Sequence, residues 1–372
     1  MPYGWLSNNS IYAELGMDYS KVVENIIENG EPGFLWLENM QKYSRMCEAP
    51  DNKDFRALGG NPCLEQTLES FEMCCLSETF PSHHESFQEF QQTLKYAFLY
   101  AKIVTLGLTH WPETNQVMQR NRRIGLSMTG IAQFLTKYDY HTLKTWCESG
   151  YSFVKAYDKF ISQKFKVPES IKITSIKPSG TVSLLGGATP GVHFPHSRFY
   201  IRRVRLSNKS ELIKNLLDCG YHVEPDQMQP DSTMVASFPI DQGEGIKTIN
   251  DTNIWEQLSL VAFMQNYWAD NQVSCTVSFC KQKEGKQIKS ALDIFQYKLK
   301  GISFLPRFED KTPYPQMPYE EIDEETYNKM FAKIKINKEK NGNNYNSNKN
   351  KKLFANADGE GSNFCDSDKC DV

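Results

Sequence analysis

A short polar segment, Asn61-Pro62-Cys63-Leu64-Glu65, places three chemically useful side chains at alternate positions. Pro62 disfavours helical backbone angles at the preceding residue, so the segment is predicted to be extended. Alternate side chains of an extended chain share a face, which brings Asn61, Cys63 and Glu65 together. They offer a hydrogen-bonding amide, a thiol able to act as nucleophile or radical carrier, and a general base. From the residues alone, the competing interpretation is an ordinary buried loop cysteine.

A second candidate segment is KPSGT at residues 177–181, which follows a predicted strand. Hydroxyl groups and free backbone N–H groups around a glycine suit a turn that binds phosphate, although a plain turn is the alternative. The segment lacks the GxxxxGK[ST] spacing of a P-loop, which argues against a P-loop ATPase. His193 and His196 follow in a glycine-rich run and are interpreted as loop or core histidines, because no paired spacing of metal ligands is present.

The ten cysteines of the chain need separate interpretations. The first ten residues lack a basic region followed by an apolar run, so we expect reduced thiols and a cytoplasmic location. Cys275 and Cys280 lie in a segment that alternates like a strand, and no second pair follows at zinc spacing. Cys365 and Cys370 stand near the acidic C-terminal end. They are either a redox-active dithiol or half of a zinc site completed by neighbouring aspartates.

Composition limits the classes of function. The 372 residues include 42 Lys and Arg against 45 Asp and Glu, a formal net charge of −3. This balance argues against a chain held mainly by nucleic-acid phosphates or by an anionic membrane surface. No stretch approaches the roughly 18 apolar residues of a membrane span. We therefore expect small molecules or proteins as partners.

Hydrophobic periodicity predicts the elements that position these residues. Helices are predicted over 18–30, 85–106, 142–165 and near 209–217, 251–268 and 288–299, and strands over 171–176, 199–206, 234–240 and 273–279. Strands that alternate with helices predict parallel βαβ units in a barrel or layered sheet. Residues 51–72 carry little periodicity and are predicted to be a long loop. Residues 337–352 contain 7 Asn and 5 Lys, which is typical of a flexible linker.

Five motifs in order give the chain a resemblance to a known family. NPCLEQTLESFEMCCL, RRIGLSMTGI, IKPSGTVSLLGGATPGVHF, NYWADNQVSCTVSF and the cysteine-containing tail resemble the monomeric, adenosylcobalamin-dependent ribonucleoside-triphosphate reductases. The resemblance runs from about Gly4 to the C-terminus. It implies an α/β fold, the C-terminal half of a ten-stranded α/β barrel with an active-site finger loop and a flexible C-terminal tail. The expected division is a partial barrel over 1–335, a disordered linker over 336–356 and a redox-active tail over 357–372.

The resemblance implies an activity and residues that carry it. The activity is reduction of ribonucleoside triphosphates to 2′-deoxyribonucleoside triphosphates, started by adenosylcobalamin. Cys63 matches the cysteine that becomes a thiyl radical and abstracts the 3′ hydrogen, Glu65 the base for the 3′-hydroxyl proton, and Asn61 the amide that binds the ribose hydroxyls. Cys74 matches one of two thiols that reduce the sugar and form a disulfide.

Further residues match parts of the family that bind substrate, cofactor and reductant. The expected assignments are Ser179, Gly180 and Thr181 for the substrate phosphates, Lys177, Gly187, Gly191, His193 and Phe194 for the corrin, and Cys365 and Cys370 for a dithiol arm that thioredoxin or a similar donor reduces. No residue is expected to ligate a metal directly. No nucleic acid or membrane is expected as a partner.

The chain departs from the family pattern at two positions. The family has Gly where this chain has Leu64, in a tight loop where positive φ would disfavour a side chain. It has Asn where this chain has Cys75. Adjacent residues of an extended segment point in opposite directions, so only one of Cys74 and Cys75 should face a substrate, and position favours Cys74.

Length gives a final expectation. The family's catalytic chain is about twice as long, so a missing N-terminal half would supply the first strands of the barrel and the cysteine partner of Cys74. Half a barrel would leave an open strand edge. The alternative function is a truncated, catalytically inert remnant that binds nucleotide or corrin.

Overall fold

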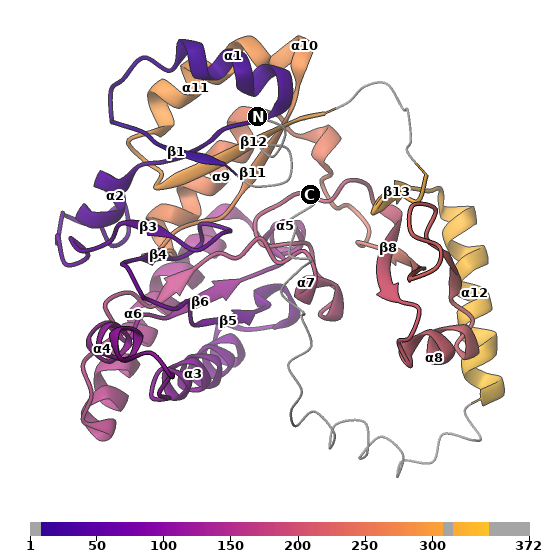
Figure 1. The fold of residues 1–372 in the computed structure, drawn as a ribbon, viewed down its shortest axis with the longest axis horizontal. Helices are drawn as coiled ribbons and strands as arrows, with labels where there is room; N and C mark the ends of the chain where they lie inside the picture. The colour runs from indigo at the N-terminus through magenta and orange to yellow at the C-terminus, as the bar shows by residue number, and fades with distance from the viewer. Residues whose placement is uncertain (1–8, 308–314, 342–372) are drawn as a thin grey trace. The chain divides into compact units, whose positions relative to one another are not determined.

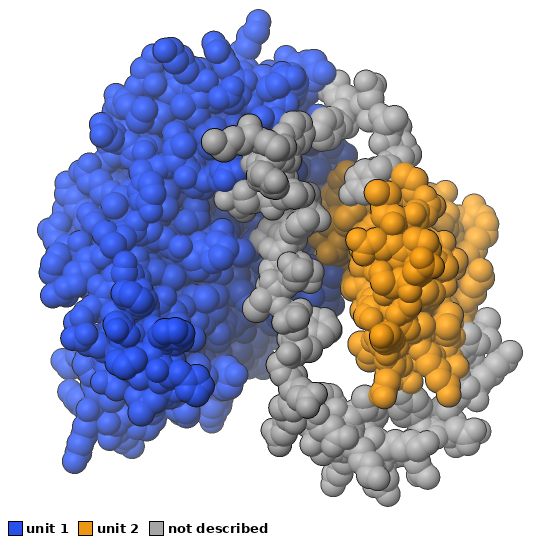
Figure 2. All heavy atoms as spheres, in the orientation of Figure 1, with its two compact units in different colours: residues 1–195, 245–309, 372 blue, residues 196–244, 310–371 orange. Residues whose placement is uncertain are grey.

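The structure, a computed structural model, describes residues 9–307 and 315–341, with side chains up to residue 334. Its contacts divide these residues into two compact units (Figure 2). Unit 1 holds the described residues up to 195 and from 245 to 307, and unit 2 holds 196–244 and 315–341. No helix in the described ranges is long and apolar enough to cross a membrane.

Unit 1 contains a mixed α/β fold built on two small sheets (Figure 1). One has the order β1-β2-β12-β11, from Ser10–Tyr12, Gly33–Leu35, Gly301–Arg307 and Thr276–Cys280; the other has the order β5-β6-β7, from Leu76–Thr79, Gly125–Met128 and Thr174–Ser175. All neighbours are parallel except β12 and β2. A parallel bridge from Ile176 to Val273 connects β7 with the segment that enters β11.

Five helices of unit 1, at 20–29, 87–104, 140–165, 254–267 and 288–295, were predicted from hydrophobic periodicity, and the other five were not. The described residues of unit 1 contain ten helices. They are α1 Ser20–Asn29, α2 Leu37–Lys42, α3 Phe87–Val104, α4 Pro112–Asn121, α5 Ile131–Lys137, α6 Tyr140–Phe165, α7 Val182–Leu185, α9 Ile254–Tyr267, α10 Lys281–Glu284 and α11 Ile288–Phe295, with short 3-10 turns at Pro81–His83, Ile249–Asp251 and Gly285–Gln287. Side chains cap the long ones: Ser86 accepts from the Glu89 amide before α3, and Asp139 accepts from the Thr142 amide before α6. Helix α1 ends at Gly30, whose φ of 85° is left-handed.

Aromatic residues fill the core of unit 1. Helix α3 packs on β5 and on α6 (Figure 1), and the ring of Trp146 lies 5.4 Å from Phe90 and 5.1 Å from Phe134. Trp268, at the end of α9, is fully buried and its indole N–H donates to the carbonyl groups of Leu126 and Ser175. This contact fixes α9 against the two central strands β6 and β7.

Unit 2 corrects the prediction of parallel pairing. Its sheet has the order β13-β8-β10-β9, and every neighbouring pair is antiparallel. The strands are β8 Phe199–Ser207, β9 His222–Pro225, β10 Thr233–Asp241 and β13 Tyr319–Glu321, with helices α8 Leu212–Asp218 and α12 Glu324–Asn341. The predicted strands 199–206 and 234–240 correspond to β8 and β10, which are antiparallel neighbours. Strand β9, which was not predicted, follows α8, so the chain reverses direction once more before it enters β10.

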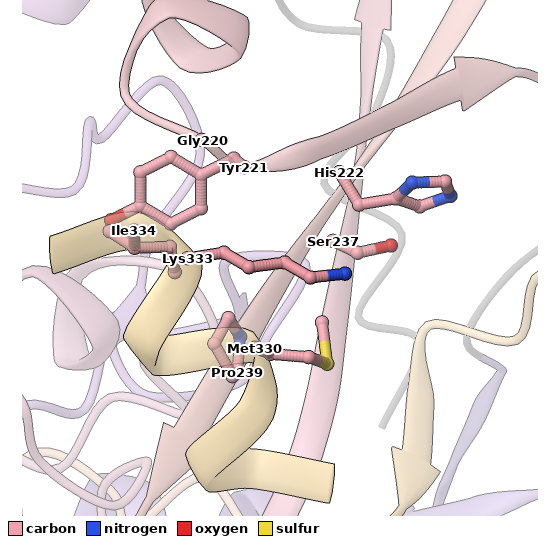
Figure 3. A pocket seen from close by; sticks show the side chains of 8 residues that line it. All are labelled: Gly220, Tyr221, His222, Ser237, Pro239, Met330, Lys333 and Ile334. Carbon is pink, nitrogen blue, oxygen red and sulfur yellow. The ribbon is translucent and has the colours of Figure 1, made fainter. Parts of the chain in front are cut away.

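Two further features of unit 2 bear on the predictions. Helix α12 continues to Asn341, six residues past the expected domain boundary at 335. A small hollow between β9, β10 and α12 is lined by eight residues, with the Lys333 side chain extended across it in Figure 3. It contains none of the cysteines or predicted phosphate-binding residues.

Candidate active site

Residues 61–66 form the turn of a hairpin between β3 (Gly59–Gly60) and β4 (Thr67–Leu68). The Leu64 amide donates to the Asn61 carbonyl at 2.8 Å, and the Gln66 amide donates to the Asn61 side-chain oxygen at 3.0 Å. The predicted extended conformation is therefore wrong. Pro62 occupies the second position of a β-turn, where its fixed φ is favourable. Leu64 has φ 57°, so the position where the family has Gly is left-handed in this chain too.

The turn, rather than an extended strand, brings two of the three predicted side chains together. Asn61 and Glu65 are both buried and their side chains share a hydrogen bond. Cys63 lies between them in the sequence and is partly buried. Three bonds hold the turn on the seam between β7 and β11: the Glu65 carbonyl accepts from the Gln272 amide and the Ser175 hydroxyl, and the Cys63 carbonyl accepts from the Ser274 hydroxyl at 2.6 Å.

The Glu65 carboxyl group is buried and only partly satisfied by hydrogen bonds. Burial raises the pKa of its carboxyl group above the ordinary value, while the hydrogen bond with Asn61 and the charge of Lys177 act in the opposite direction. Its Oε2 atom is buried without a hydrogen-bond partner. Such an atom costs roughly 1–3 kcal/mol unless a ligand satisfies it.

Cys74 and Cys75 point in opposite directions, as adjacent residues of an extended segment should. Cys74 is exposed, whereas the Cys75 thiol is buried in the core and donates to the Ala101 carbonyl at 3.3 Å. Burial and the charge of Glu65 raise the pKa of the Cys74 thiol, and the charge of Lys177 lowers it. Cys74 is thus electrostatically coupled to the hairpin turn. None of the eight described cysteines forms a disulfide.

Gln66 is a site residue that the sequence analysis missed. Its fully buried amide accepts from the Cys75 backbone N–H at 3.1 Å and donates to the Cys75 carbonyl at 3.2 Å. These two bonds connect the hairpin with β5 at the residue beside Cys74. The only available signal was its place next to Glu65, since a glutamine gives no sign in sequence of the partner it will bind.

The segment 177–181 also forms an unusual turn. Ser179 is buried with φ 50°, and its hydroxyl has no hydrogen-bond partner. Gly180 and Thr181 are exposed, and a Cβ atom at Gly180 would meet nothing within 4 Å. Lys177 Nζ lies 3.6 Å from Glu78 Oε2, which places a cation beside the turn. A backbone of this kind, with open space before it and an unsatisfied hydroxyl, is able to receive an anion.

Of the five residues predicted to contact a corrin, Gly187 is open to solvent, whereas Gly191, His193 and Phe194 make internal contacts. Gly187 is exposed with open space above it, while a Cβ at Gly191 would lie 2.2 Å from the Lys177 carbonyl oxygen. Both ring nitrogens of His193 have protein partners, the Pro190 carbonyl and the Thr276 amide, and burial lowers the pKa of the ring. Phe194 packs in the hydrophobic core. These contacts favour structural roles for Gly191, His193 and Phe194.

Buried polar atoms without hydrogen-bond partners are frequent in the segments that carry these residues. They include Oε2 of Glu65 and Glu78, the hydroxyls of Ser77, Ser82, Ser179 and Thr189, and both amide atoms of Gln272. Native proteins leave few such atoms unsatisfied. Ordered water or a polar ligand can satisfy these atoms. The described residues contain no group of three or more metal-ligating side chains; Cys365 and Cys370 lie outside the described residues.

Comparisons with known proteins show what the chain is similar to. No protein-family model matches the chain. A probable adenosylcobalamin-dependent ribonucleoside-triphosphate reductase of Dictyostelium discoideum is 59% identical over 335 residues, which are 90% of this chain and 44% of the relative. The corresponding reductase of Euglena gracilis is 52% identical over 368 residues, 99% of this chain and 49% of the relative.

A solved structure supports the same relationship. The crystal structure of a B12-dependent (class II) ribonucleotide reductase matches 96% of this chain and 52% of its own, with a TM-score of 0.80 and 31% identity. The chain spans about half the length of the curated relatives it matches. It is therefore homologous, over nearly all of its residues, to about half of an adenosylcobalamin-dependent, class II ribonucleotide reductase.

Proposed function

We propose that the chain carries the reaction site of an enzyme that reduces ribonucleoside triphosphates to 2′-deoxyribonucleoside triphosphates for DNA synthesis. One observation supports the proposal: a single hairpin turn carries Asn61, Cys63 and Glu65, with Asn61 hydrogen-bonded to Glu65, and the charge of Glu65 raises the pKa of the Cys74 thiol. The names of the relatives supply the reaction class. Thiol chemistry of this kind requires a reducing compartment, in keeping with the cytoplasm.

The residues divide the reaction among themselves. The Cys63 thiyl radical takes the 3′ hydrogen of the ribose, Glu65 takes the 3′-hydroxyl proton, and Asn61 holds the ribose hydroxyls. Loss of the 2′ hydroxyl as water requires a proton, and the sugar radical then requires reduction. Cys74 and a second thiol supply two electrons and two protons and become a disulfide, and Cys63 returns the hydrogen to the 3′ carbon.

The substrate phosphates are assigned to the turn at Ser179, Gly180 and Thr181. The unsatisfied Ser179 hydroxyl, the open space at Gly180 and the nearby Lys177 ammonium group support this assignment. The charge of Lys177 acts on both Glu65 and Cys74. A polyanion bound beside Lys177 would therefore place the attached ribose near the hairpin. Lys177 therefore serves the phosphates and the reacting groups together.

Adenosylcobalamin fits the same surface in part. When bound, it supplies the one-electron chemistry that converts the Cys63 thiol to a thiyl radical. Gly187 and the 88% exposed Leu185 offer an open, partly apolar face without side-chain obstruction, which suits a flat macrocycle. Of the five predicted contacts, Gly187 is exposed and Lys177 and His193 are partly buried, but both ring nitrogens of His193 already have protein partners.

The fold of the whole enzyme is proposed to be a barrel completed by further strands. Through the Ile176–Val273 bridge the strands of unit 1 follow the order β1-β2-β12-β11-β7-β6-β5, and no strand within residues 9–307 pairs with the outer edge of β1 or β5. Exposed edges of this kind invite pairing. We assign the missing strands and the cysteine partner of Cys74 to a region equivalent to the remaining half of the relatives, on the N-terminal side.

The cysteine tail is proposed to renew the site. Cys365 and Cys370 would reduce the disulfide at Cys74 by thiol exchange and be reduced in turn by thioredoxin or a similar dithiol. The exposure of Cys74 supports this route, because an incoming thiolate must reach one of the sulfur atoms.

The test is formation of dATP from ATP with adenosylcobalamin and dithiothreitol, using the chain together with the other half of a relative. We expect activity that is lost in Cys63→Ala and kept in Cys75→Ala, whose thiol lies in the core. Inactivity of the assembled pair, despite bound nucleotide, would instead support the inert binding remnant.

A further inference from the structure

One arginine connects the two ends of the segment that carries the reacting residues. Arg123 lies just before β6 and is fully buried. Its Nη1 and Nη2 donate to the two carboxylate oxygens of Asp54 at 2.8 and 2.6 Å, and its Nε donates to Glu72 Oε1 at 2.9 Å. Asp54 precedes the hairpin and Glu72 follows it, and each is nine residues from Cys63.

The contacts use the particular geometry of guanidinium. Its planar fork binds one carboxylate through two parallel bonds while the remaining N–H reaches a second carboxylate in another direction. An ammonium group has the same charge but cannot hold both partners in fixed directions. Arg123 therefore constrains the distance and orientation between the two arms of the hairpin, which a single charge would not do.

Neighbouring residues complete the charge and hydrogen-bond requirements of this cluster. Lys172 Nζ lies 2.9 Å from Asp54 Oδ2 and donates to the Met40 carbonyl, and Asn121 donates to Glu72 Oε1 at 3.0 Å. The charges of Lys172 and Arg123 hold the pKa of the Asp54 carboxyl far below its ordinary value despite burial. The Asp54–Arg123 pair stays ionised throughout the physiological range.

We infer that Arg123 is a positioning residue, which holds Asp54 and Glu72 and thereby fixes the turn that presents Cys63 and Glu65. The catalytic meaning of this inference rests on the proposed function, but the mechanical one does not. Glu72 also precedes Cys74 by two residues, so the same clamp places the exposed thiol relative to the turn.

The chain offers a matched control for loss of a buried ion pair. Lys102 and Asp158 form an equally buried pair at 2.6 Å between α3 and α6. Lys102 also donates to the Pro168 carbonyl and the Ser170 hydroxyl, and none of these partners belongs to 51–72. A variant there disturbs the core without releasing the hairpin.

The experiment measures alkylation of individual cysteines in the native chain by iodoacetamide and mass spectrometry. In Arg123→Lys, which keeps the charge and loses the fork, we expect Cys63 to react about tenfold faster, because local opening sets such rates. Asp54→Asn and Glu72→Gln should each give a smaller increase. Lys102→Met should leave the Cys63 rate within about twofold. Cys147, which is fully buried in the core, reports through its protection that each variant is folded.

The outcomes separate the alternatives. An unchanged Cys63 rate in folded Arg123→Lys overturns the inference, and so does an equal acceleration in Lys102→Met. If Cys147 loses its protection in Arg123→Lys, the test passes to Asp54→Asn and Glu72→Gln. An unchanged Cys63 rate in these folded variants would then overturn the inference. The measurement needs neither substrate nor cofactor, so failure of dATP formation would count against the proposed function and leave this result intact.

Discussion

Arginines in the two units bind buried carboxylates but differ in their own exposure to water. Arg123 in unit 1 is fully buried with Asp54 and Glu72, whereas Arg205 in unit 2 keeps 40% of its side chain exposed while its Nε lies 2.7 Å from Asp226. Water screens the second pair, and its contribution to stability is small. Inside unit 1 the same chemistry has large consequences, since removal of one partner leaves an uncompensated charge. The N–O distance alone does not distinguish the buried ion pairs of Arg123 from the ion pair of Arg205.

The largest effect should come from Arg123→Met. The variant leaves Asp54 and Glu72 buried without their shared partner, so we expect the free energy of unfolding to fall by about 3–5 kcal/mol. Urea denaturation followed by circular dichroism measures it. A loss in the free energy of unfolding below about 1 kcal/mol would mean that water reaches Asp54 and Glu72. The ion pairs of Arg123 and Arg205 would then not differ in their contribution to stability.

Glu65→Gln should have an intermediate effect whose size depends on pH. Burial raises the folded pKa of Glu65 above its unfolded value, so the folded state binds the proton more tightly and ionisation of Glu65 destabilises it. At pH 8 the free energy of unfolding of the variant should therefore be about 1 kcal/mol higher than that of the parent chain. The gain should vanish as the pH falls below the unfolded pKa. A gain that persists at low pH would show that charge burial is not its cause.

Arg205→Met should have the smallest effect. The Arg205 side chain is 40% exposed, and the buried Asp226 keeps its bonds from the Met228 and Gln229 amides when Arg205 is lost. We therefore expect a loss of at most about 1 kcal/mol, which 1 M NaCl should abolish. Thermal unfolding at low and high salt checks this. A salt-independent loss comparable with that of Arg123→Met would contradict the distinction between the two regions.

Local pattern predicted the helices well and the hairpin turn poorly. Helices α1, α3 and α6 begin and end within a few residues of the predicted positions, because periodicity and caps are local signals. Pro62 restricts its own φ and the preceding residue, and both restrictions fit an extended segment as well as a turn, so it did not reveal that the Leu64 amide closes a turn on Asn61. Asn61 and Glu65 were nevertheless expected together, and they are, since a tight turn also makes near neighbours in sequence meet.

The buried cluster had no signal in sequence. Asp54, Glu72, Arg123 and Lys172 are distant along the chain, and each alone resembles a surface charge. Their pairing is decided by which strands become neighbours. For the same reason neither strand β9 nor the antiparallel pairing of β8 with β10 was predicted. Adjacent Cys74 and Cys75, by contrast, needed only the alternation of an extended segment.

The opposite orientation of Cys74 and Cys75 disfavours a disulfide bond between these two neighbours. A bond between neighbouring cysteines closes a strained eight-membered ring, and the two Cβ atoms must point toward each other to form it. Here the Cys75 sulfur would first have to leave the core and its bond to Ala101. Cys74 is therefore expected to form a disulfide with a thiol from another segment and not with Cys75.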